Sequence, residues 1–277
     1  MIIDGRKISK EILTRIKSEV AELPHTPVFC DILVGSDPAS VQYVRMKAKT
    51  AESVGMKFRS AEFPEAITTE ALIEEIENLN RVPHMCGIIM QLPLPDYIDR
   101  QKVLDAIDPR LDVDYLGTIQ SQKFYSSNTM TGFPTALACM KALESVFSNL
   151  SGKNIAVVGQ GRLVGKPVAH LLESKGYSVA KIDSATEHKE ALIKNADIVI
   201  SAVGMGKFIT GENIKTGAIV IDAGTSEDNG AIVGDVDLAS VEPVASYVSP
   251  TPGGVGPITV AMLLSNVLMN AKEMYGH

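Results

Sequence analysis

Residues 155–167 read IAVVGQGRLVGKP, and this stretch is the most direct indication of the fold class. A run of β-branched residues leads into three glycines, Gly159, Gly161 and Gly165, and then into a segment with helical periodicity. Glycines between a strand and a helix let the backbone approach a pyrophosphate, which the free amide groups at the helix N-terminus attract. The spacing GxGxxxG is one residue longer than the common fingerprint, and turns after strands are often rich in glycine. The prediction of a nucleotide site therefore depends more on the position of this stretch between a strand and a helix than on the glycines alone.

Strand and helix patterns alternate on both sides of this stretch. After it, short β-branched runs recur as YSVAKID, ADIVISAV and AIVIDAG. Before it, VFCDILV, KFRSAEF and CGIIMQ alternate with helical patterns near residues 7–22 and 68–80. Such alternation is typical of βαβ units around a mostly parallel sheet. The sequence predicts an α/β protein of two αβα domains with a ligand cleft between them, the second being a Rossmann-type, doubly wound nucleotide-binding domain.

The chain of 277 residues is long enough for these two domains. Residues 109–133 lose periodicity and are rich in Ser, Thr, Gly and Asn, so we expect them to connect the domains. A helix is expected over residues 134–147, and the apolar C-terminal pattern predicts a last helix that packs on the first domain. The expected boundaries are 1–133, completed by the helix 257–277, for the first domain and 134–256 for the nucleotide-binding domain.

Composition excludes several classes of function. A formal net charge of −7 without a basic stripe disfavours a nucleic acid partner. The start MIIDGRKISK lacks the apolar core of a secretion signal, and no run approaches the ~18 apolar residues of a membrane span, so we expect a cytoplasmic protein with no membrane partner.

Cysteine and histidine usage gives no sign of a metal site. The three cysteines, Cys30, Cys86 and Cys139, fit neither a disulfide framework nor a CxxC pair, and we interpret them as small buried hydrophobes. The five histidines show no ligand spacing, so no metal is expected.

The stretch SVQYVRMK, residues 40–47, lies in a helix that is expected to begin at Pro38 after the N-cap Asp37 and to end near Gly55. Helical spacing places Tyr43 and Lys47 next to each other, on a shoulder between the apolar and the solvated faces. The apolar stripe is expected to comprise Val41, Val44, Ala48 and Ala51. A lone pair of this kind is more often a surface feature than the edge of a site. A lysine on a shoulder is expected to contribute little to stability.

Two further segments are candidates for a site. Gln91 follows a predicted strand and precedes LPLP, so it is expected at the carboxyl edge of the sheet, where ligands collect in α/β folds. Residues 249–259, SPTPGGVGPIT, contain prolines and glycines that fix an unusual backbone path, and Pro257 suits the first position of the last helix. By itself this segment fits a rigid hinge and a ligand loop equally well.

Together these motifs resemble those of the methylenetetrahydrofolate dehydrogenase/cyclohydrolase family. SVQYVRMK, CGIIMQLPLP, LDVD, VVGQGRLVGKP, AIVIDAG and SPTPGGVGPIT occur in the order and at about the spacing of that family, over nearly the whole chain. QLPLP and PGGVGP are the specific motifs, whereas the glycine loop alone is not. The resemblance implies oxidation of 5,10-methylenetetrahydrofolate to the methenyl form with NAD(P), followed by hydrolysis to 10-formyltetrahydrofolate, and a homodimer.

The resemblance also implies roles for residues on the folate side. Lys47 resembles the general acid/base, Tyr43 the ring that stacks on the folate, and Gln91 the partner that holds the lysine. Asp114, the second acid of LDVD, resembles the residue that binds the pterin. Removal from water helps a lysine to exchange protons near neutral pH, and a carboxylate suits the donor-rich edge of a reduced pterin. The backbone that borders the folate is expected to be that of Pro252, Gly253, Gly254, Val255 and Gly256.

On the cofactor side the resemblance and the residues differ. The family default is NADP, held in many members by the arginine and serine of a GRS loop, whereas this sequence has Gln160 and Gly161 there. Asp183 follows the next strand and is placed to accept hydrogen bonds from a free ribose 2′-OH, with Ser184 beside it, which favours NAD. Arg162 could still reach a phosphate. The full predicted set is Gly159, Gln160, Gly161, Arg162, Gly165, Asp183, Ser184 and Thr225.

Departures from the family pattern leave two alternatives open. Tyr115 follows DVD where glycine is usual, TGFP replaces a PCTP-like stretch, and Thr225 replaces an isoleucine. One alternative is a dehydrogenase for a folate or another pterin that lacks the hydrolase step, although Lys47 and Gln91 argue against that loss. The other is a nucleotide-binding regulatory protein with a decayed site, which would bind reduced folate without turnover.

Overall fold

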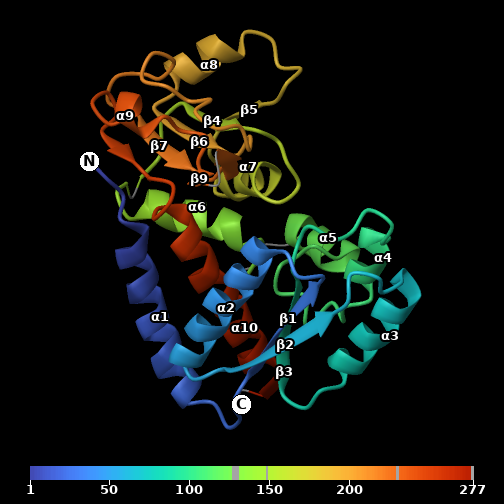
Figure 1. Ribbon diagram of the computed structural model, residues 1–277. Helices are drawn as coiled ribbons and strands as arrows, with labels where there is room; N and C mark the ends of the chain where they lie inside the picture. Colours follow the sequence, from blue (N-terminus) through green and yellow to red (C-terminus); the bar gives the residue numbers. More distant parts are fainter. Residues whose placement is uncertain (127–130, 148, 229–230, 276–277) are drawn as a thin grey trace. The chain divides into compact units, whose positions relative to one another are not determined.

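The computed structural model describes residues 1–126, 131–147, 149–228 and 231–275, and Figure 1 shows its helices and strands. The chain divides into two compact units, and each is built from two separate segments. Unit 1 comprises Met1–Glu11 and Thr135–Met262, and unit 2 comprises Ile12–Pro134 and Leu263–His277. Within the described chain, no helix combines the length and the apolar content that crossing a bilayer requires.

Unit 2 is built on a parallel sheet of three strands in the order β2-β1-β3. The strands are β1 (Val28–Val34), β2 (Lys57–Phe63) and β3 (Met85–Met90). The helices that lie in unit 2 wholly or in their greater part are α1 (Gly5–Ala21), α2 (Pro38–Ser53), α3 (Thr69–Asn80), α4 (Arg100–Asp105), α5 (Thr118–Ser126) and α10 (Val255–Tyr275). Every residue of β1 and β3 is buried, which confirms the prediction of apolar parallel strands.

The core of unit 2 joins residues from both ends of its sequence. Phe29 of β1 and Ile89 of β3 lie in one apolar cluster with Ile16 of α1 and with Leu264 and Leu268 of α10. The side chain of Asn266, also on α10, is buried and donates to the backbone carbonyls of Val113 and Gly132, at 2.8 Å each. The C-terminal helix is therefore part of this core through both apolar and polar contacts.

Helix α2 begins as the sequence predicts, but its buried face differs. Asp37 is the N-cap and accepts from the amide of Ser40 at 2.8 Å, Pro38 is the first helical residue, and Gly55 follows the helix with a φ of 88°. The buried residues are Ser40, Val44, Lys47 and Ala51. The prediction that Lys47 lies on a shoulder is therefore wrong, because the buried stripe is rotated toward it by a side-chain contact with β1.

Unit 1 is built on a parallel sheet of five strands in the order β10-β7-β6-β4-β5. The strands are β4 (Ile155–Val158), β5 (Val179–Ile182), β6 (Ile198–Ser201), β7 (Ile219–Asp222) and β10 (Tyr247–Val248). The helices are α6 (Pro134–Glu144), α7 (Gly165–Ser174), α8 (Lys189–Asn195) and α9 (Leu238–Val241), and a small antiparallel pair joins β8 (Ser226–Asp228) to β9 (Ala231–Val233). The order reverses between β4 and β6, which is the doubly wound arrangement predicted from the alternating runs.

The expected connection at residues 109–133 is partly regular structure. Helix α5 lies within it, and residues 127–130 lie outside the described residues. The helix was not recognisable because TIQSQKFYS has little apolar periodicity. It begins where Asp105 accepts from the amide and the hydroxyl of Thr118, at 2.6 and 2.9 Å, and it is anchored by the buried ring of Phe124. Both contacts are tertiary, so the local sequence pattern does not show them.

Candidate active site

Lys47 is the centre of a polar cluster inside unit 2. Its Nζ atom lies 2.8 Å from Oε1 of Gln91, to which it donates, and 2.6 Å from Oδ2 of Asp31, with which it forms an ion pair. The side chain of Lys47 is 3% exposed and that of Asp31 is 0% exposed. A lysine so far removed from water is held by these partners in one position.

The strands of the sheet deliver both partners. Asp31 lies in the middle of β1, the central strand, where the backbone groups are engaged in the parallel ladders. Gln91 follows β3, and its amide donates to the carbonyl of Ile32 at 2.8 Å, which extends the pairing by one residue. The side-chain Nε2 of Gln91 donates to the carbonyl of Leu92 at 2.9 Å. This second bond fixes the amide so that its oxygen faces Lys47.

Tyr43 lies one helical turn before Lys47, as the sequence predicts. Its ring centroid is 4.8 Å from Nζ of Lys47, and the residue is 39% exposed. Partial burial, assisted by the carboxylates of Asp114 and Asp31, raises the pKa of Tyr43 to about 12. The ring therefore keeps its hydroxyl proton and is accessible for stacking, while the lysine next to it is enclosed.

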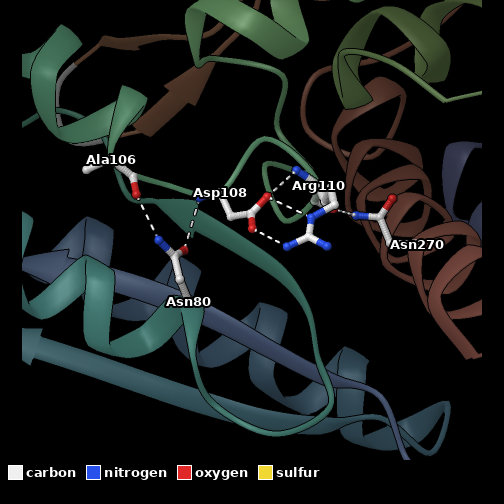
Figure 2. A network of polar contacts seen from close by, with 5 residues as sticks. All are labelled: Asn80, Ala106, Asp108, Arg110 and Asn270. Atoms are coloured by element: carbon white, nitrogen blue, oxygen red, sulfur yellow. Dashed lines mark hydrogen bonds and ion pairs between the residues drawn. The ribbon is translucent and has the colours of Figure 1, made fainter.

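The segment after α4 carries the two acids of LDVD, and a polar network fixes it (Figure 2). Asn80 of α3 donates to the carbonyl of Ala106 at 2.9 Å and accepts from the amide of Asp108 at 3.1 Å. Asp108 is bound by Arg110 through both carboxylate oxygens, at 3.1 and 2.6 Å. Asn270 of α10 donates to the carbonyl of Arg110 at 2.6 Å. Two helices thus hold the loop in register ahead of Asp112 and Asp114.

The two acids of LDVD have different environments. Asp112 is buried and accepts from the amides of Gly117 and Leu116, at 2.7 and 3.3 Å, so its role is structural. Burial raises the pKa of Asp112 to about 6 against the effect of these amides. Burial, and next the charge of Asp112, raises the pKa of Asp114 to about 7, while Lys47 acts in the opposite direction. Asp114 is therefore poised to change its charge near neutral pH.

The structure thus brings Lys47, Tyr43, Gln91 and Asp114 into one electrostatically coupled group in unit 2. The sequence interpretation missed Asp31. The signal for it was the single charged residue in the apolar strand VFCDILV, where a charge needs a partner. The described part of the chain contains no cluster of three or more His, Cys, Asp or Glu side chains suited to a metal ion. Cys30, Cys86 and Cys139 are buried free thiols, which confirms their interpretation as small core residues.

The glycine loop in unit 1 has the geometry of a backbone cradle. Gly159 has a φ of 87°, and a Cβ there would clash with the carbonyl oxygen of Ala202. A Cβ on Gly165 would clash with the carbonyl oxygen of Gly159, whereas one on Gly161 would meet nothing within 4 Å. The first glycine thus lets the turn pack against the backbone that follows β6, and the third closes the turn against its own backbone. Gly161 leaves open space before the amide groups at the start of α7, which fits a pyrophosphate.

The other predicted cofactor residues lie at the ends of neighbouring strands. Asp183 follows β5, is exposed, and accepts through Oδ1 from the amide of Ala185 and the hydroxyl of Thr186, at 2.9 Å each. Ser184 and Thr225 are also exposed, the latter after β7. The side chain of Gln160 turns back and donates to the carbonyl of Val157 at 3.0 Å. Arg162 is exposed in the loop before α7.

The segment 249–256 is folded tightly within unit 1. The amide of Gly254 donates to the carbonyl of Pro250 at 2.7 Å, and the amide of Gly5 donates to the carbonyl of Gly253 at 3.1 Å. A Cβ on Gly254 would lie 2.5 Å from the oxygen of Pro250, whereas one on Gly256 would meet nothing within 4 Å. Helix α10 begins at Val255, two residues before the predicted start at Pro257, which falls within the first turn. This packing fits a rigid segment with one open glycine and leaves the choice between hinge and ligand loop open.

Comparison with known families covers almost the whole chain. Residues 3–114 match the catalytic domain of tetrahydrofolate dehydrogenase/cyclohydrolase, and residues 134–275 match the NAD(P)-binding domain of the same family. The chain belongs to the tetrahydrofolate dehydrogenase/cyclohydrolase family. Lys47, Gln91, Tyr43 and Asp114 lie within the part that matches the catalytic domain, and the glycine loop lies within the other.

Individual members of the family are similar over their full length. The bifunctional protein FolD of Staphylococcus epidermidis is 40% identical over 279 residues, covering 99% of this chain and 98% of the relative. The crystal structure of the bifunctional FolD enzyme of Campylobacter jejuni has a TM-score of 0.94 and 34% identity, with 99% of each chain covered. The Trypanosoma brucei enzyme, solved with NADP and an inhibitor, has a TM-score of 0.93 and 36% identity, covering 99% of this chain and 98% of its own.

Proposed function

We propose that this family member oxidises 5,10-methylenetetrahydrofolate to the methenyl form with NAD(P)+ and hydrolyses the methenyl form to 10-formyltetrahydrofolate. The observation that carries this proposal is the buried Lys47, held 2.8 Å from Gln91 beside the accessible ring of Tyr43. A decayed binding protein has no need to keep a lysine in a buried, hydrogen-bonded position. That retention also weighs against a relative with the dehydrogenase step alone.

The roles of the cluster follow from the chemistry of the two steps. In hydrolysis, water adds to the bridging carbon of the methenyl group and loses one proton, which leaves a hydroxyl on that carbon. The bond from the carbon to N5 then breaks: the hydroxyl gives up its proton to become the formyl carbonyl and N5 gains a proton, so that one proton is released overall. Lys47 is the group proposed to move these protons, with Gln91 fixing its position. Tyr43 stacks on the folate, and Asp114 binds the donor-rich edge of the pterin. Bound NAD(P)+ accepts the hydride in the first step, for which the chain supplies alignment.

The proposed cofactor site is the open turn around Gly161 at the start of α7. The exposed carboxylate of Asp183 and the absence of a charge at Gln160 support a preference for NAD over NADP. Asp183 accepts a ribose hydroxyl well and repels a 2′-phosphate. Arg162 in this loop and Lys166 in the first turn of α7 are exposed cations that favour the opposite outcome.

Further proposals concern organisation. We assign the folate role to residues 1–133 with the helix 257–277, and the cofactor role to residues 134–256. In this proposal Pro252, Gly253, Gly254, Val255 and Gly256 border the folate. The proposed homodimer is tested by the mass in solution from light scattering, and the proposed cytoplasmic location by fractionation.

A spectral assay tests the proposed function. The protein is mixed with 5,10-methylenetetrahydrofolate and either NAD+ or NADP+, and the absorbance of the methenyl product and of the reduced cofactor is followed. The expected result is equal formation of the two, followed by decay of the methenyl signal faster than in buffer. Formation without accelerated decay indicates a dehydrogenase alone, and binding without either signal contradicts the proposal.

A further inference from the structure

The carboxylate of Asp31 has an unusual position. It lies on the central strand of the unit 2 sheet, where neither of its oxygens has a hydrogen-bond partner of acceptable angle in the described chain. Among the residues that the structure describes, its one charged contact is the ammonium group of Lys47 at 2.6 Å. A buried carboxylate is costly to the fold unless it is paired, and an apolar residue at such a position is often at least as stable. Packing therefore gives no reason for an acid at position 31.

The contact with the ammonium group of Lys47 gives a reason for an acid at position 31. The ammonium group of Lys47 donates to Gln91 and lies 2.6 Å from Oδ2 of Asp31, so two groups of the protein hold it. The ring of Tyr43, 4.8 Å away and partly exposed, marks the remaining side. With contacts from β1 and from the end of β3, the position of the Nζ atom is fixed. The pair thus presents a fixed ammonium group for a reaction, in place of a freely moving one.

The ionisable groups around Lys47 lie at different distances from it. Asp31 from β1 is in contact, Tyr43 from α2 stays neutral over the working range, and Asp114, from the segment after α4, acts through space. Gln91 carries no charge. Burial raises the pKa of Asp31, and Lys47 acts against this. The titration of Asp31 is thus coupled to Lys47, its contact partner.

We infer that Asp31 is a positioning residue for Lys47 in methenyl hydrolysis, and that its carboxylate sets the pH at which Lys47 gives up its proton. The effect on the rate of hydrolysis rests on the proposed function, whereas the effect of Asp31 on Lys47 itself does not. Asp31 touches neither substrate nor cofactor in this scheme, and it acts through the lysine. An opposite charge in contact typically displaces a titration by one to three pH units.

The test compares Asp31→Asn with the matched control Glu62→Gln, an exposed acid on the adjacent strand β2. The first measurement is the pH profile of kcat/KM for methenyl hydrolysis. The second, on the ligand-free protein, is a carbon NMR titration of lysine labelled at Cε, in which Lys47→Met identifies the signal. In Asp31→Asn we expect both the alkaline inflection of the profile and the midpoint of the Lys47 signal to move down by about one pH unit or more. Glu62→Gln should leave both unchanged.

Each result decides the inference. If neither quantity moves in Asp31→Asn, or if the Lys47 signal moves while the rate profile stays, the inference is overturned. If Asp31→Asn does not fold, the wild-type protein decides: the carboxyl signal of Asp31 and the Cε signal of Lys47 must share their inflections, and separate inflections reject the coupling. A wild type without hydrolysis contradicts the proposed function instead, and the NMR titration still decides whether Asp31 controls Lys47.

Discussion

The hydroxyl of Tyr115 donates a hydrogen bond to Oγ1 of Thr131 over 2.6 Å, although the backbone of Tyr115 lies in the left-handed region with a φ of 63°. A non-glycine residue adopts this conformation only when its surroundings compensate. The compensation is an aromatic cluster in which the ring of Tyr115 lies 6.1 Å from that of Phe124 and 6.0 Å from that of Phe133. Tyr115 thus anchors the loop next to Asp114.

Substitution of Tyr115 measures this anchor. Tyr115→Phe removes only the hydroxyl contact and should cost about 0.5–1.5 kcal/mol of unfolding free energy. Tyr115→Gly relieves the backbone strain but deletes a buried ring, so we expect a net loss of roughly 2–4 kcal/mol. Chemical denaturation of both variants checks the order, with Tyr97→Phe on an exposed ring as the control. A glycine variant as stable as the wild type would show that the ring does not compensate the strain.

Lys47→Met should abolish methenyl hydrolysis and destabilise the fold. Loss of a proton-transfer group costs roughly 100- to 10,000-fold in rate. A lysine on the shoulder of the helix was expected to contribute little to stability. Because Lys47 is buried, its removal leaves Asp31 unpaired, which costs about 3–5 kcal/mol of unfolding free energy at pH 8. Stopped-flow decay of the methenyl signal and urea denaturation measure the two effects. Lys49→Met, on the exposed side of the same helix, is the control for both.

The stability loss in Lys47→Met should depend on pH with a definite sign. Burial already raises the pKa of Asp31 in the folded protein above that in the unfolded chain, and removal of the lysine raises it further. At a pH between the pKa of Asp31 in the unfolded chain and its pKa in the folded variant, the folded variant binds a proton that the unfolded chain does not. The stability of the variant therefore falls as the pH rises through this range. The difference from wild type should therefore be smaller at pH 5.5 than at pH 8. A difference independent of pH would mean that Asp31 does not take up the proton.

Asp114→Asn should weaken folate binding about 10- to 150-fold at pH 8, the equivalent of roughly 1.5–3 kcal/mol for a charge-assisted hydrogen bond, and leave cofactor binding unchanged. Because the pKa of Asp114 is raised to about 7, the wild type should lose folate affinity as the pH falls through neutrality. The asparagine variant should show no such dependence. Calorimetric titration with each ligand between pH 6 and pH 8 checks both statements. Equal loss of both ligands would assign Asp114 to the fold instead of the site.

The double substitution Asp183→Ser with Gln160→Arg should raise the use of NADP relative to NAD. It removes a carboxylate that repels a 2′-phosphate and adds a cation in the loop before α7. The measurement is kcat/KM for both cofactors, with Asp183→Asn as the control for the turn bonds to Ala185 and Thr186. A wild type that prefers NADP tenfold or more would reject the NAD proposal and assign the phosphate contact to Arg162.

The sequence predicted those elements whose signals are local. The predicted strands VFCDILV and KFRSAEF coincide with β1 and β2, and Asp37 with Pro38 marked the start of α2, because pattern and cap depend only on neighbouring residues. Helix α5 was missed because its start depends on Asp105, which lies outside the helix.

Four members of the candidate site were named from the sequence, whereas Asp31 and the burial of Lys47 were not predicted. Tyr43, Lys47, Gln91 and Asp114 were named from motifs, and the structure couples them. The phase of α2 could not be read from its sequence, because Val41 and Ala48 compete with Ser40 and Lys47 for the buried face. An ion pair with Asp31 in another strand decides that competition, and periodicity contains no information about such a partner.

The division of the chain has a consequence for synthesis on the ribosome. Unit 2 needs the side chains of Leu264 and Leu268 for its core, but residues 135–262 of unit 1 are made first. At the usual rate of translation this delay is on the order of ten seconds, during which residues 12–134 expose the apolar surface that α10 later covers. The nascent chain is thus a natural client for chaperones that act on emerging polypeptides, and truncation before Leu263 leaves the first-made part without its last core helix.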